Sequence, residues 1–130
     1  MEIEIFALCD FAQDANGKMN IIGVFDTVNV ATLPVKLHTF YYAARIRFNS
    51  TEAGNHKLSI TLSDSNTKQI LSPFEANLNI EQSGQSVDTV FNLAIGVNNA
   101  TIEKESKHNI KLLIDGSILK DLPLYIKRRQ

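Results

Sequence analysis

The first twenty-five residues carry a β-hairpin pattern that constrains the chain to an all-β fold. Two segments with apolar residues on both faces, 3–12 and 19–25, flank the turn sequence Asp14-Ala15-Asn16-Gly17. Asn-Gly favours a two-residue hairpin turn because both residues tolerate positive φ. A strand that is apolar on both faces must be covered on both. We therefore expect this hairpin to lie inside a larger β structure.

Alternating apolar and polar residues continue through the rest of the chain. This period of two fits the segments better than helical spacing does, and Gly, Asn and Asp favour turns in the gaps between them. The predicted turns are at 53–55, 64–66, 83–84 and 115–116. The predicted strands are 3–12, 19–25, 40–48, 58–63, 74–81, 87–97, 110–114 and 122–126.

The remaining segments and the prolines complete the fold prediction. The stretch 98–109 is polar and charged, and we interpret it as a long loop with room for one helical turn. Pro34 falls in a link, whereas Pro73 and Pro123 lack an amide hydrogen and so belong at edges, bulges or strand starts. About eight strands in 130 residues predict a sandwich or a barrel. Most of the later strands have apolar residues on one face and polar residues on the other, as the sheets of a sandwich do. We therefore predict an antiparallel β-sandwich in which residues 1–130 form a single domain.

The charge balance argues against nucleic acid and membrane as partners. Thirteen basic and fourteen acidic residues leave a net charge of −1, and the basic run Lys127-Arg128-Arg129 is too short for strong phosphate binding. No apolar run reaches the roughly eighteen residues of a membrane helix. The acidic start MEIEIF does not resemble a secretory signal. We expect a cytoplasmic protein.

The sequence contains no recognisable catalytic or metal-binding motif. There is no phosphate-binding glycine loop and no Gly-x-Ser-x-Gly segment. The single cysteine, Cys9, lies in a strand pattern and is interpreted as a small buried hydrophobe, because a nucleophile would need a neighbouring base. His38, His56 and His108 lie far apart, at no metal-ligand spacing. We therefore predict a non-enzymatic protein with no catalytic residues, metal or cofactor.

Four oxygen-bearing residues cluster in and beside the first hairpin: Asp10, Asp14, Asn16 and Asp26. Such groups can bind calcium, but the segment lacks the twelve-residue calcium-loop pattern and its closing glutamate. In tight turns these residue types usually bond to the backbone. Asp10 is distinct because it interrupts an apolar strand, and burial would require a hydrogen bond or raise its pKa. A capping role, pairing with a neighbouring strand and a functional role all stay open for Asp10.

Tyr41, Arg45 and Arg47 share one face of the predicted strand 40–48 and are the candidate ligand-binding residues. A guanidinium beside a phenol can bind an anion, a sugar or a protein surface. Arginines placed in this way more commonly form cross-strand ion pairs on a solvated sheet face.

The hairpin also carries a family resemblance. The segments Ala7-Leu8-Cys9-Asp10-Phe11-Ala12 and Asn16-Gly17-Lys18-Met19-Asn20-Ile21-Ile22-Gly23-Val24-Phe25-Asp26 resemble the opening of a bacterial family of small all-β proteins of unknown function. Looser similarities are Ala53-Gly54-Asn55-His56 and the pair Asp115-Gly116 with Leu122-Pro123-Leu124. The resemblance implies a β-sandwich in a non-secreted bacterial protein, and it brings no catalytic residues.

Two functions from different classes follow. The first is a protein–protein interaction or assembly module that offers a sheet face or edge to a protein partner or to a second copy of itself. The alternative is a small-ligand or carbohydrate-binding module that uses Tyr41, Tyr42, Arg45 and Arg47. An enzyme ranks third, because nothing in the sequence supplies its chemistry.

Overall fold

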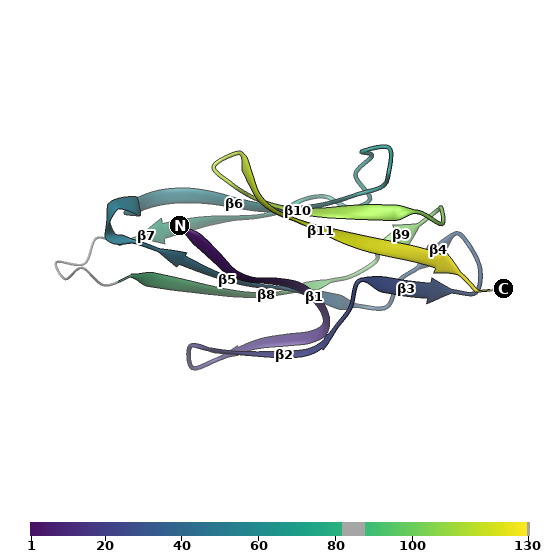
Figure 1. Ribbon diagram of the computed structural model, residues 1–130, viewed down its shortest axis with the longest axis horizontal. Coiled ribbons are helices and arrows are strands. Elements are labelled where there is room, and N and C mark those ends of the chain that lie inside the picture. Colours follow the sequence, from purple (N-terminus) through teal and green to yellow (C-terminus); the bar gives the residue numbers. More distant parts are fainter. Residues whose placement is uncertain (82–87, 130) are drawn as a thin grey trace.

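The computed structural model describes residues 1–81 and 88–129, whose strands form two facing sheets (Figure 1). One sheet has the order β2-β1-β5-β8 and the other β3-β11-β10-β6-β7, with the short pair β4-β9 beside them. In chain order the strands are β1 (Glu2–Ala15), β2 (Lys18–Val24), β3 (Thr27–Val30), β4 (Val35–Lys36), β5 (Phe40–Phe48), β6 (Gly54–Ser63), β7 (Phe74–Ile80), β8 (Thr89–Val97), β9 (Thr101–Ile102), β10 (Lys107–Ile114) and β11 (Ser117–Arg128). A 3₁₀ turn, η1 (Ser50–Glu52), lies between β5 and β6.

Both sheets bury alternate residues in one shared core, which confirms the predicted β-sandwich. The period-two pattern turns every second side chain of β5 and β10 inward, toward the facing sheet. The four-stranded sheet contributes Leu8, Phe40, Tyr42, Ala44, Ile46, Phe48 and Val97. The five-stranded sheet contributes Val30, Leu58, Ile60, Leu62, Leu78, Ile80, Ile110, Leu112, Ile114, Leu124 and Ile126.

The eight predicted strands are present, and three short ones join them: β3, β4 and β9. The prediction of one long loop at 98–109 is wrong. Residues 101–102 pair with β4, residues 107–109 already belong to β10, and the segment contains no helical turn. Ile102 is fully buried, and one apolar residue among polar ones is too short a pattern to predict a strand. The predicted turn at 83–84 and the strand start at Val87 lie outside the described residues.

One pairing departs from the expected antiparallel arrangement. After the first hairpin the chain crosses between the sheets within two residues: the Phe25 amide donates to the Leu8 carbonyl, and the Asp26 carbonyl accepts from the Tyr125 amide. This crossing delivers β3 to the edge of the other sheet in the same direction as β11, so that the two strands pair in parallel. Pro73 directly precedes the edge strand β7, and Pro123 lies where β3 has not yet joined β11. Both positions fit the prediction of an edge, a bulge or a strand start.

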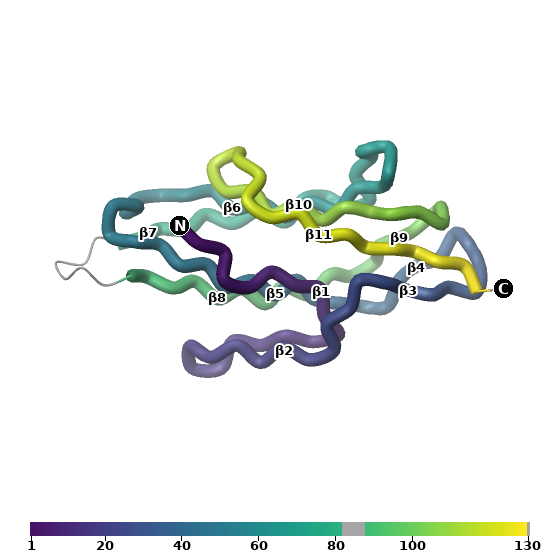
Figure 2. Tube along the Cα trace, viewed as in Figure 1, coloured from purple at the N-terminus to yellow at the C-terminus, as the bar shows by residue number. Residues whose placement is uncertain are grey.

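The first hairpin folds back over the outer face of its own sheet (Figure 2). Residues Glu2–Cys9 pair with β5, whereas Cys9–Ala15 pair with β2. At the hairpin tip, Asn92 Nδ2 of β8 donates to the Gly17 carbonyl at 3.1 Å. Ala12 is buried beneath the hairpin with Cys9 and Ala43. The predicted cover on both faces is therefore wrong for β2, which packs one face inward and leaves the other in solvent.

Gly23 favours this fold-back because it has no side chain. Its φ is +73°, and a Cβ there would overlap the Asp10 carboxylate. Asp10, the polar residue that interrupts the apolar pattern of β1, is exposed and lies against Gly23. It marks the point where β1 stops pairing with β5 and begins to pair with β2. Gly17 has a similar φ of +80° in the hairpin turn, but a Cβ there meets no atom within 4 Å.

We expect Gly23→Ala to destabilise the protein more than Gly17→Ala. Both variants bear the left-handed strain of about 1–2 kcal/mol, but only Gly23→Ala adds the overlap with Asp10. Urea unfolding of the two variants and of wild type measures the difference, and the double variant Asp10→Gly/Gly23→Ala should recover part of it. Equal losses in the two single variants would contradict the role given to the Asp10–Gly23 contact.

His56 ties three segments together at one end of the sandwich. Its Nδ1 lies 2.6 Å from Asp115 Oδ2 in the β10–β11 turn, and its Nε2 lies 2.6 Å from the Glu52 carbonyl oxygen of η1. Asp115 Oδ1 also accepts from the Lys57 amide at 2.9 Å. Because both partners of the ring are acceptors, both ring nitrogens must donate, which requires the imidazolium form. The Glu52 carbonyl and the Asp115 carboxylate accordingly raise the pKa of His56 above its ordinary value of 6.5.

The stabilisation from His56 should therefore be present below about pH 6.5 and disappear as the pH rises through its raised folded-state pKa. We expect the unfolding free energy of wild type to fall over this range more steeply than that of His56→Gln, which cannot become charged. Denaturant titrations from pH 5 to pH 8.5 measure both slopes. Parallel pH profiles for the two proteins would show that His56 is not held as an imidazolium.

Candidate functional site

The predicted ligand-binding arginines of β5 are engaged with one carboxylate of β1. Glu4 accepts from Arg45 Nε at 3.0 Å through Oε1 and from Arg47 Nε at 3.0 Å through Oε2. These hydrogen bonds, that of Arg47 foremost, lower the pKa of Glu4. Arg45 also donates to Asn92 Oδ1 at 3.0 Å. The cross-strand ion pairs expected on this face are therefore present, and they occupy both guanidinium groups.

The two tyrosines beside these arginines lie on opposite faces of β5. The Tyr41 ring packs edge-on against Phe11 at 5.2 Å between centroids, under the folded-back hairpin. Tyr42 points into the core, where burial raises its pKa to about 12. The sequence-based grouping of Tyr42 with Tyr41, Arg45 and Arg47 is wrong, because neighbouring residues of a strand face opposite ways.

The other reactive side chains do not gather into one site. Cys9 is fully buried, as predicted, and burial raises the pKa of its thiol. His56 binds Asp115, and His108 is buried near the start of β10, where Ser106 is its hydrogen-bonding partner. Among residues 1–81 and 88–129, no three His, Cys, Asp or Glu side chains are placed to hold a metal ion. No helix in the same residues is long and apolar enough to cross a membrane.

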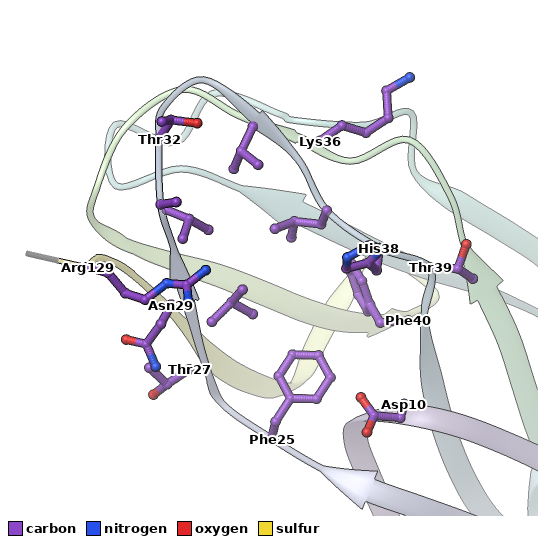
Figure 3. A pocket seen from close by; sticks show the side chains of 15 residues that line it. Asp10, Phe25, Thr27, Asn29, Thr32, Lys36, His38, Thr39, Phe40 and Arg129 are labelled. Atoms are coloured by element: carbon purple, nitrogen blue, oxygen red, sulfur yellow. The ribbon is translucent and has the colours of Figure 1, made fainter.

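A cavity of about 600 Å³ opens at the end of the sandwich opposite His56, and we call it the end groove (Figure 3). One wall is β3 with the residues that follow it, 27–32, and the other is the returning segment 35–40. Its interior is apolar, with Phe25 and Phe40 packed edge-to-face at 6.0 Å and valine side chains beside them. The groove is the mouth between the two sheets at the β3 edge.

Charged and polar side chains border this apolar interior. Asp10 and His38 lie near Phe40, whereas Arg129 lies near Asn29 on the β3 side (Figure 3). In the described part of the chain, neither Asp10 nor Arg129 forms an ion pair. A cavity of this volume with an apolar floor and a few polar groups at its mouth has the properties of a binding site.

The wall formed by β3 also exposes backbone groups. The Asp26 and Val30 carbonyls accept from the Tyr125 and Arg129 amides, so even-numbered positions of this strand direct their backbone groups to β11. By alternation, the amide and carbonyl groups of Thr27 and Asn29 point away from β11. Because β3 ends the order of its sheet, these groups lie along a free edge beside the groove.

Sequence reasoning missed the end groove, except that it singled out Asp10 and His38. Most of the lining comes from residues 27–39, which it treated as a link between strands. The one available signal was the alternation of Val28 and Val30 around Asn29, which is too short to predict a strand alone.

Comparison with known proteins places the chain in a family without assigning a role. A family of unknown function, DUF6941, matches residues 4–127. The chain belongs to this family. The match agrees with the resemblance found in the sequence, since it too points to a family of unknown function. No curated protein and no solved structure matches the chain.

Proposed function

We propose that this DUF6941 member is a non-enzymatic protein-interaction module of the bacterial cytoplasm that binds an extended segment of a partner protein in the end groove. The observation that carries the proposal is the free β3 edge beside an apolar mouth of about 600 Å³. An added strand would pair with the backbone groups of Thr27 and Asn29 and place alternate side chains in the groove. The single buried thiol supports a cytoplasmic location, where cysteines stay reduced.

The chemistry of the groove defines the partner segment. Phe25, Phe40 and the valines favour apolar side chains at every second position of the partner, because successive residues of a strand alternate in direction. Arg129 favours a carboxylate near the β3 side of the groove, and Asp10 favours a basic group near Phe40. The proposed ligand is thus an extended peptide with alternating apolar residues and opposite charges toward its ends.

A small amphipathic ligand is the second candidate, and the volume of the same cavity favours it. The expected site on Tyr41, Arg45 and Arg47 receives less support, because Glu4 and Phe11 engage these side chains. A small molecule in the groove would depend on the apolar interior and not on the backbone edge of β3.

Asn29→Pro separates the two candidates. Proline removes an amide hydrogen that β11 does not use, and edge positions of this kind tolerate proline. We expect peptides selected from a random displayed library to bind wild type and to bind Asn29→Pro about tenfold more weakly, since a hydrogen bond is lost and the ring crowds the edge. Isothermal titration measures both affinities, and Asn29→Ala, which keeps the amide, is the matched control.

Two outcomes would count against strand addition. The first is a set of selected peptides with no apolar alternation, or with equal affinity for wild type and Asn29→Pro. The second is a small amphipathic compound that raises the melting temperature of both proteins equally while no peptide binds. A saturating ligand at a hundred times its dissociation constant should stabilise the fold by about 2.7 kcal/mol.

A further inference from the structure

The outer face of the first hairpin exposes an apolar strip. The exposed fractions of Phe11, Ile22 and Val24 are 42%, 61% and 66%. Phe11 lies directly opposite Ile22 in the pairing of β1 with β2, and Val24 is two residues further along the same strand. Contiguous apolar side chains along a free strand edge mark a surface for association with another chain.

The backbone along this strip is free to pair as well. β2 ends the order of its sheet, and Asn16 and Gly17, both at positive φ, form a two-residue turn flanked by the Ala15–Lys18 pair. In such a hairpin the residues that flank the turn bond across to each other. Lys18, Asn20 and Ile22 therefore direct their backbone groups to β1, whereas Met19 and Ile21 direct theirs to the free edge.

Two charged residues at the ends of this segment select the occupant. Lys18 begins β2, and the exposed Asp26 lies two residues beyond its end, where the Asp26 carbonyl accepts from the Tyr125 amide. No other charged residue lies between Lys18 and Asp26. Within the described chain, neither residue forms an ion pair. In an antiparallel copy centred on Ile22, each Ile21 lies opposite the other copy's Gly23. Beyond the paired strands, the Lys18 side chain of each copy extends toward the Asp26 side chain of the other. This pairing also brings the two Ile22 side chains together at the centre of the strip.

We propose that two copies of this chain associate by antiparallel pairing of their β2 edges. The pairing joins the two apolar strips into one and satisfies the Ile21 backbone groups that the monomer leaves open. One strand pair with a few apolar side chains is a small interface, which fits a dissociation constant in the micromolar range. Asn29, on the free edge of β3, takes no part in this contact, so a variant at Asn29 separates the association from the proposed peptide binding.

Sedimentation velocity from about 1 µM to about 1 mM tests the association. We expect wild type to change from monomer to dimer over this range. Ile22→Lys should weaken the dimer by at least about tenfold without loss of folding, because the side chain is largely exposed. Thermal unfolding followed by circular dichroism checks that the variant is folded.

Charge reversal tests the antiparallel register. Lys18→Asp and Asp26→Lys should each weaken the dimer about threefold to tenfold, and the double variant should restore it. Lys120→Asp, which reverses an exposed lysine of β11, is the matched control and should leave association unchanged. Wild type that stays monomeric at about 1 mM, a dimer that tolerates Ile22→Lys, or a double variant as weak as the single ones would overturn the proposal. Asn29→Pro should leave the dimer intact even if it abolishes peptide binding.

Discussion

The contact between Asp10 and Gly23 is the constraint on which the rest of the arrangement depends. It stands where β1 leaves β5 and pairs with β2 instead, and the positive φ of Gly23 bends the returning strand. The two residues that follow β2 then bond to different sheets, Phe25 to Leu8 and Asp26 to Tyr125. The position of β3 at the edge of the second sheet, and with it one wall of the end groove, follows from this crossing.

The two sheets need different outer cover because their outer faces differ in composition. Cys9, Ala43 and Ala94 make the middle of the four-stranded sheet small and apolar on its outer side, and the hairpin can approach it closely. The five-stranded sheet carries Ser59, Thr61 and Lys111 at outward positions of β6 and β10, which water can cover. The third layer therefore lies on one side only, and its far surface is left to solvent or to a partner.

The sequence predicted the long strands well because each has enough alternating residues to define a face. β5 and β10 are examples, with every second side chain buried as the pattern requires. It failed for β3, β4 and β9, which have two to four residues and depend on neighbours that only the folded chain supplies. The cross-strand ion pairs of Arg45 and Arg47 were foreseeable from spacing, but their partner, Glu4, came from the register between β1 and β5.

In the opening hairpin, the sequence determines the local structure, whereas the tertiary structure determines which face is buried. Its turn, its strands and the burial of Cys9 follow from local rules: Asn-Gly reverses the chain, and apolar residues leave water. The sequence does not predict which face of the hairpin is covered, because both faces are apolar. Tertiary structure decided it, since the bend at Gly23 can lay only one face of the hairpin on β5 and β8. The same bend set the edge of β3 beside the end groove, through contacts between residues about a hundred positions apart in the chain.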